Sequence, residues 1–145
     1  MRIDCRPGFF VLLLALTAPL WALGINKDSG GLAIKGYDPV AYFKARKPVK
    51  GSSSYAHTWH GAVWQFATEQ NKQAFADDPE KYAPQYGGYC AYAVSSDSTA
   101  AIDPKAWIVA AGKLYLFKDT DTQAVWEQDM EGCIRRADVN WPRLH

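Results

Sequence analysis

Two segments of this chain place strand-forming residues on either side of a short turn that contains glycine. In residues 55–66, arms at 55–59 and 63–66 are rich in aromatic and β-branched residues and flank a turn at His60-Gly61-Ala62. Residues 106–109 and 114–117 flank a second turn around Gly112. Runs of this kind, separated by a glycine turn, predict β-hairpins. The strands are therefore expected to pair locally, which is unlike the spaced βαβ units of a parallel sheet.

Short helices are expected around the hairpins. Asp38-Pro39 predicts a helix over residues 40–43, because aspartate accepts hydrogen bonds from free N–H groups at a helix start and proline suits the first helical position. Asp78-Pro79 opens a turn in the same way, and Asp103 is also expected to act as a cap. Thr68 is expected to cap a helix over residues 69–76 that buries Phe75.

The C-terminal segment has apolar residues at helical spacing, namely Trp126, Met130, Cys133, Ile134 and Ala137. Gly132 interrupts this pattern, so one helix and two short helices are equal alternatives. No internal repeat of useful length is visible. The sequence predicts an α+β fold, a small single domain with two β-hairpins and short helices around an aromatic core.

The first residues resemble an export signal. Arg2 and Arg6 precede an apolar stretch over residues 8–20, and small residues at 22–24 suit cleavage before Ile25. We expect a signal peptide over residues 1–24, a mobile lead-in over 25–35, and a periplasmic or secreted protein. After cleavage, no membrane span is expected to remain.

The charge balance of the remaining chain limits its partners. It has 14 basic and 14 acidic residues (16 − 2 and 15 − 1), and these form no basic cluster. A neutral chain without a basic patch is not typical of proteins that bind nucleic acid, so we expect no nucleic-acid partner. A protein partner, if there is one, is not identified by the sequence.

The run Tyr86-Gly87-Gly88-Tyr89-Cys90 is the strongest candidate for a site. Glycines allow a close approach of the backbone to a ligand, and a cysteine after them can lie at a helix N-terminus, which favours the thiolate. A thiolate is a soft metal ligand or a nucleophile. His57 is the better histidine partner because it shares a strand face with Tyr55 and Trp59. Cys133 on the C-terminal stripe is predicted to be a buried apolar residue.

The motifs together resemble a known family. They lie at residues 36–43, 59–66, 75–91, 113–116 and 137–142, and they include Gly-Gly-Tyr-Cys-Ala at 87–91. This pattern resembles the YHS-domain proteins of bacteria in their exported, single-domain form, and it implies a YHS-like domain over residues 36–145. Related modules are linked with heavy metals, often copper, through cysteines beside the hairpin and in the next helix. Here Ala67 and the helix at 69–76 supply no cysteine.

Three functional hypotheses follow. The first is a binding module for a small ligand or a metal ion, copper or zinc, near Cys90. Cys90 and His57 would contact the metal, and the ligand-binding residues would be Tyr37, Tyr42, Trp64, Tyr86, Gly87, Gly88 and Tyr89. The second is a structural or interaction domain without a small ligand.

The third hypothesis is a thiol enzyme, in which Cys90 is the nucleophile and His57 or His60 the base. The absence of an obvious resolving cysteine disfavours redox cycling. We expect a binding module rather than an enzyme.

Overall fold

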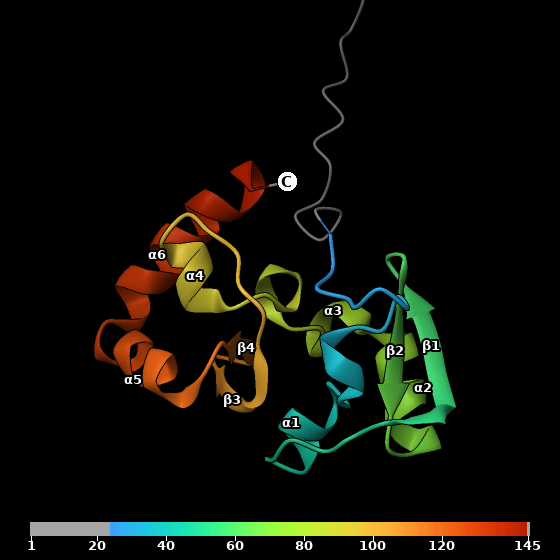
Figure 1. Cartoon of the computed structure of the whole chain (residues 1–145). Helices are drawn as coiled ribbons and strands as arrows, with labels where there is room; N and C mark the ends of the chain where they lie inside the picture. Colours follow the sequence, from blue (N-terminus) through green and yellow to red (C-terminus); the bar gives the residue numbers. More distant parts are fainter. Residues whose placement is uncertain (1–23, 145) are drawn as a thin grey trace, which may run out of the picture.

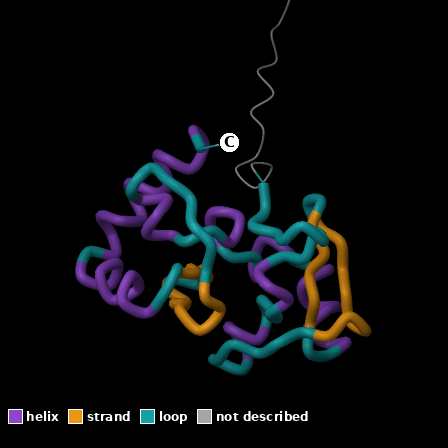
Figure 2. Tube along the Cα trace, viewed as in Figure 1, coloured by secondary structure: helices purple, strands orange, loops and turns teal. Residues whose placement is uncertain are grey.

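The structure is a computed structural model that describes residues 24–144. The predicted signal peptide lies outside the described residues except for Gly24. Within residues 24–144, no helix is long and apolar enough to cross a membrane. The fold is a small α+β domain with two antiparallel two-stranded sheets, which confirms the predicted fold class (Figures 1 and 2).

The chain forms two groups of elements that lie side by side (Figure 1). The first group holds hairpin β1–β2 with helices α1 to α3, and the second holds hairpin β3–β4 with helices α4 to α6. The elements of the first group are α1 (Ala41–Lys44), β1 (Ser52–Trp59), β2 (Ala62–Phe66), α2 (Glu69–Asp77) and α3 (Pro79–Tyr82). Those of the second are α4 (Ala91–Ser95), β3 (Asp103–Ala110), β4 (Lys113–Phe117), α5 (Thr120–Gln128) and α6 (Met130–Asn140).

The two groups are structural repeats. Ser52 pairs with Phe66 in the first hairpin and Asp103 pairs with Phe117 in the second, a constant offset of 51 residues (103 − 52 and 117 − 66). Both hairpins shift register directly after that pair. The same offset relates the starts of α2 and α5, and those of α3 and α6. A structural repeat is therefore present, although no internal repeat of useful length is visible in the sequence.

Backbone geometry recurs with the same offset. His60 and Gly61 have φ angles of 49° and 72°, and Ala111 and Gly112 have 50° and 74°. This pair of positive φ angles is the type I′ turn that matches the twist of a hairpin.

The side chains explain why the repeat is hidden in the sequence. Gly61 and Phe66 recur as Gly112 and Phe117, but most of the counterparts differ.

Each repeat has its own aromatic core. In the first, Phe75 of α2 packs against Trp64 and Phe66, each with ring centroids 5.2 Å apart. In the second, Trp126 of α5 packs against Tyr115 and Phe117, each at 5.4 Å. Thr68 and Asp119 cap these two helices by accepting bonds from the N–H groups of Asn71 and Thr122. The predicted cap at Thr68 and the burial of Phe75 are confirmed.

Asp38 joins three elements of the first repeat. Its side chain is fully buried, and Oδ1 accepts hydrogen bonds from the N–H groups of Val40 (2.8 Å) and Ala41 (3.2 Å) at the start of α1. Oδ2 accepts from the Ala67 N–H after β2 (2.9 Å) and from Asn71 Nδ2 of α2 (2.8 Å). Its role thus includes the predicted cap and extends to hairpin and helix packing. Asp103, in contrast, lies at the start of β3 and bonds the Lys105 N–H, so it caps no helix.

The C-terminal pattern forms two helices that are divided at Asp129, between α5 and α6. The expected break at Gly132 was wrong, because Gly132 lies in the first turn of α6 and donates its N–H to Asp129 Oδ1. A Cβ at Gly132 would overlap that carboxylate. The glycine therefore accommodates the helix cap.

Residues 25–35, expected to be a mobile lead-in, contact the first repeat and the link between the repeats. The Asn26 N–H bonds the Gly87 carbonyl at 2.8 Å, and Asn26 Nδ2 bonds the Gly88 carbonyl at 3.0 Å. Ala33 is fully buried and donates to the Val63 carbonyl of β2. Through these contacts, residues 25–35 are part of the packed fold. The predicted start of the domain at residue 36 stays a prediction.

Candidate functional site

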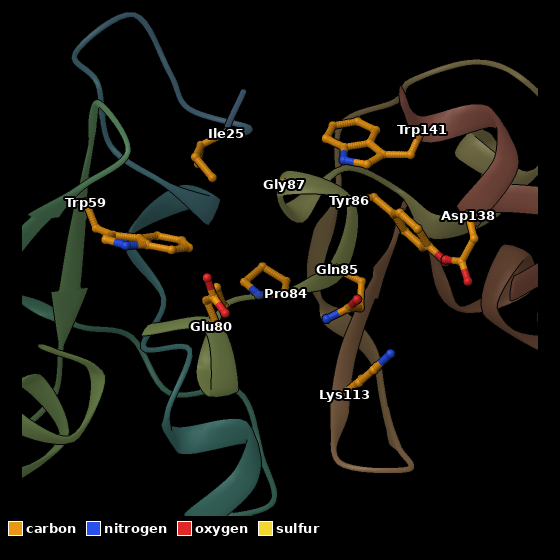
Figure 3. A pocket seen from close by; sticks show the side chains of 11 residues that line it. Ile25, Trp59, Glu80, Pro84, Gln85, Tyr86, Gly87, Lys113, Asp138 and Trp141 are labelled. Atoms are coloured by element: carbon orange, nitrogen blue, oxygen red, sulfur yellow. The ribbon is translucent and has the colours of Figure 1, made fainter. Parts of the chain in front are cut away.

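A cleft of about 390 Å³ lies where the two repeats meet. Figure 3 shows Trp59 and Glu80 on one side of it and Tyr86, Asp138 and Trp141 on the other. Pro84, in the link between the repeats, lies between the two sides. The full lining is Ile25, Trp59, Glu80, Ala83, Pro84, Gln85, Tyr86, Gly87, Lys113, Asp138 and Trp141. Its volume lies in the range of small-molecule pockets.

Trp59 forms the wall on the side of the first repeat. It is the last residue of β1, and its ring packs edge-on against Phe75 with centroids 5.6 Å apart. The His60 ring lies in the turn that follows, and its centroid is 3.9 Å from that of the Trp59 ring. Burial lowers the pKa of His60 below its ordinary value of 6.5, although the nearby Glu80 carboxylate acts in the opposite direction. The turn thus presents a half-buried indole beside an imidazole that favours its neutral form.

The opposite wall depends on a strained piece of backbone. Tyr86 and Gly87 have φ angles of 57° and 63° inside the 3₁₀ segment Gln85–Gly88. A tyrosine in this left-handed region is uncommon, and such strain is often found at functional sites. The bend lets the Tyr86 hydroxyl reach α6, where it donates a hydrogen bond of 2.9 Å to Asp138 Oδ1.

Burial and the Asp138 carboxylate together raise the pKa of Tyr86 above its ordinary value of 10.0. The neighbouring Trp141 is almost fully buried, and its ring centroid lies 6.2 Å from that of Tyr86. The wall on this side is therefore a packed aromatic pair with a neutral phenol at physiological pH.

The cleft carries charge of both signs. Glu80 in α3, Asp138 in α6 and Lys113 at the start of β4 are all exposed to solvent. Within residues 24–144 the ion pairs join Arg136 to Asp129 and Arg143 to Asp97, so neither lining carboxylate belongs to one. The described lining therefore has one more negative than positive group.

The predicted ligand-binding residues are divided between the cleft and the core. Tyr86 and Gly87 line the cleft, and Tyr89 packs on Trp141 at 6.0 Å. Gly88 is buried beside them, and its carbonyl accepts from Asn26.

The other three predicted ligand-binding residues lie elsewhere in the first repeat. Tyr42 is fully buried and donates its hydroxyl to the Pro104 carbonyl, and Trp64 is fully buried with Nε1 bonded to the Trp59 carbonyl. Tyr37 is half-buried, and its backbone forms an isolated antiparallel β-bridge with Lys50. None of the three is among the cleft-lining residues.

Cys90 and His57 lie in different repeats. Cys90 precedes the five-residue helix α4 as its N-cap, is 1% exposed, and donates its N–H to the Ala100 carbonyl. His57 lies in β1 with its ring 6.2 Å from that of Phe75. Cys90 and Cys133 are both buried free thiols.

The donors do not fit a metal centre. No group of three histidine, cysteine or acidic residues within the described part of the chain is placed to hold a metal ion. Structural metal sites need three or four such ligands, and one buried thiol does not provide them. A metal contact by Cys90 and His57 stays a prediction that this geometry does not support.

Sequence reasoning missed most of the cleft. Trp59, Glu80 and Pro84 come from the first repeat and the link, and Asp138 and Trp141 come from the end of α6 and the residue after it. No motif joins positions so far apart in the chain. One indication of the cleft was present in the sequence. Trp59, Trp141 and residues 79–87 all belong to the segments that resemble the YHS family.

The geometry defines a small α+β module of two repeats with a ligand-sized cleft between them. Comparison with known families shows that residues 40–86 match the YHS domain. The chain therefore contains a YHS domain at residues 40–86, which the sequence motifs implied. The match covers most of the first repeat and extends to Tyr86 in the cleft. No curated protein and no solved structure matches the chain.

Proposed function

We propose that this protein is an exported binding module that holds a small organic ligand in the cleft between its repeats. The observation that carries the proposal is the cleft itself, with a volume of about 390 Å³ and aromatic side chains on two facing sides. Pockets for small molecules are typically concave and mostly apolar, with a few polar groups that orient the ligand. Trp59, Tyr86 and Trp141 supply the apolar surface of the cleft. Glu80 and Asp138 supply the polar groups.

The position of the cleft supports this role. It lies where two separately packed units meet, and binding sites are frequent at such junctions. A ligand in contact with Trp59 and Trp141 would bridge both repeats. Its binding would therefore stabilise their relative arrangement, because a ligand that binds only the folded state raises the free energy of unfolding.

Export rests on the leader-like residues 1–24, with their basic start, apolar stretch and small residues before Ile25. The periplasm or the exterior of the cell is therefore the proposed location. Intact mass and N-terminal sequencing of the protein recovered from a bacterial periplasm test it. A chain that still carries residues 1–24 would contradict processing.

The binding role can be tested with a neutral aromatic probe, 2-phenylethanol, in ligand-observed NMR. Trp59→Leu removes a cleft wall, and Trp107→Leu is a matched control because Trp107 is also a half-buried strand tryptophan but lies outside the lining. We expect binding to wild type and to Trp107→Leu, and a loss of roughly fivefold or more in affinity for Trp59→Leu. Equal binding to all three, or no binding to wild type, would contradict the proposal.

A metal-binding role is a second candidate because the YHS family is associated with metal handling, often copper transport. The buried thiol of Cys90 is the soft donor that such a role would use. Titration with copper(I) and zinc tests it. Tighter binding by wild type than by Cys90→Ser would support a metal site, and equal binding would end that candidate.

A further inference from the structure

We infer that the ligand of the cleft is an organic cation, a compound with an amine or quaternary ammonium group on an apolar body. This inference rests on the proposed function, since it names the chemical class that the same cleft selects. Two features carry it. Two carboxylates that form no ion pair with another residue of 24–144 lie on different sides of the cleft, and the surfaces between them are aromatic.

The carboxylates come from different repeats. Glu80 projects from the first turn of α3 and Asp138 from α6, and Figure 3 shows them on different sides of the cleft. Asp138 uses Oδ1 to accept the Tyr86 hydroxyl, and no other hydrogen bond to its side chain is found within residues 24–144. Glu80 has no side-chain hydrogen bond there either. Both groups therefore retain acceptor capacity for a cation that enters between them.

The aromatic walls favour the same charge. The faces of indole and phenol rings carry negative quadrupole density, which attracts a cation within about 6 Å. Trp59 and Trp141 extend into the cleft region from different sides, with Tyr86 next to Trp141 (Figure 3). Burial lowers the pKa of His60, which favours the neutral form of the ring beside Trp59 and so reduces its repulsion of a cation.

Lys113 is the one basic residue of the described lining, and it lies beside Gln85 on the Tyr86 side of the cleft (Figure 3). All three charged groups of the lining are exposed, so solvent and salt screen the repulsion by Lys113 and the attraction by Glu80 and Asp138 alike. An anionic ligand would gain this one contact and would meet two carboxylates. The balance of lining charge therefore selects against anions.

A set of probes with one common body tests the inference. Phenethylamine is cationic, 2-phenylethanol is neutral and 3-phenylpropionate is anionic, and all three carry the same phenyl group. Binding is measured by ligand-observed NMR to the chain from Ile25 onward. The variants are Glu80→Gln and Asp138→Asn. The amide oxygen of asparagine can still accept the hydrogen bond from the Tyr86 hydroxyl, so this variant preserves the cleft wall that Tyr86 forms.

The repeat supplies a matched control. Glu131 in the first turn of α6 is the counterpart of Glu80 in the first turn of α3, and it lies outside the cleft lining. We expect phenethylamine to bind tightest. Glu80→Gln and Asp138→Asn should each weaken that binding by about two- to fivefold, the range of partly exposed charge pairs. Glu131→Gln, outside the lining, should leave the binding of both phenethylamine and 2-phenylethanol unchanged.

Two results would overturn the inference and leave the proposed function standing. One is equal or tighter binding of 3-phenylpropionate than of phenethylamine. The other is an equal loss of phenethylamine binding in Glu131→Gln and Glu80→Gln, which would indicate a general charge effect. If none of the three probes binds wild type, both the inference and the proposed function are contradicted.

Discussion

The hydroxyl of Tyr86 donates a hydrogen bond of 2.9 Å to Oδ1 of Asp138, and this bond joins the link between the repeats to the last long helix. Tyr86 reaches it from a left-handed backbone conformation, with φ of 57°. The two residues are far apart in sequence, and together they hold one side of the cleft in place. The bond is therefore the first feature to perturb.

Removal of this hydroxyl is expected to weaken the fold modestly. Tyr86→Phe should lower the free energy of unfolding by about 0.5–1.5 kcal/mol, the usual net value of one hydrogen bond. Urea denaturation measures it. Tyr92→Phe is the control, since its hydroxyl makes no hydrogen bond within the described residues, and it should change stability by less than about 0.5 kcal/mol. An equal effect of both substitutions would show that the bond to Asp138 contributes nothing specific.

Stability is expected to fall in alkali. Burial raises the folded-state pKa of Tyr42 and of Tyr86 above the ordinary value of 10.0. A group with a raised folded pKa contributes its full stability below the unfolded pKa, and this contribution is lost as the pH rises above it. The free energy of unfolding should therefore decline above pH 10.0. Near-ultraviolet absorbance should show at least two tyrosines that ionise only as the protein unfolds, and ionisation of all tyrosines in the native state would contradict this.

Two glycines with similar backbone angles should respond differently to alanine. Gly87 has φ of 63°, and a Cβ there would overlap the Gly24 carbonyl. Gly112 has φ of 74°, with nothing within 4 Å of the added atom. Gly112→Ala should cost about 1 kcal/mol, the cost of the left-handed backbone alone. In a chain that retains Gly24, Gly87→Ala should cost more, and it should displace the segment that holds Ile25.

The comparison of the two glycine variants is made by thermal unfolding, with hydrogen exchange at the Asn26 amide as a local readout. That amide bonds the Gly87 carbonyl, so its protection should fall in Gly87→Ala and stay unchanged in Gly112→Ala. Equal melting temperatures with unchanged protection would mean that the N-terminal segment does not pack against Gly87 as described.

The buried carboxylate of Asp38 should be the most sensitive acidic position in the first repeat. Four N–H groups converge on its two oxygens, at distances of 2.8 to 3.2 Å. Asp38→Asn places an amide donor against donors and should cost about 3 kcal/mol in the free energy of unfolding. Asp77→Asn, an exposed position with a single side-chain partner, should cost less than about 0.5 kcal/mol. Similar costs at the two positions would refute the anchoring role of Asp38.

Local features of the fold could be predicted from the sequence because local chemistry determines them. Gly61 and Gly112 mark turns that need positive φ, and Thr68 caps a helix three residues before the N–H group that it bonds. The repeat could not be predicted in the same way. Its paired positions hold different aromatic residues, such as Phe75 and Trp126, which fill equivalent space without sequence identity.

The candidate site was predictable only in part. Tyr86 and Gly87 stood out because glycine and tyrosine gather there, and both line the cleft. Cys90, the chemically most reactive group of that run, faces the core instead, because helix α4 begins at the next residue and packs it inside. Glu80 and Asp138 come together only through tertiary packing, which no local pattern reports.

The tryptophan indole N–H signals test the central claim most directly. In a ¹⁵N-labelled chain from Ile25 onward, titration with phenethylamine should shift the indole signals of Trp59 and Trp141, which line the cleft. The indoles of Trp64, Trp107 and Trp126, which lie outside the lining, should keep their positions. Shifts confined to the latter three, or no shift in any indole at saturating probe, would contradict a ligand site between the repeats.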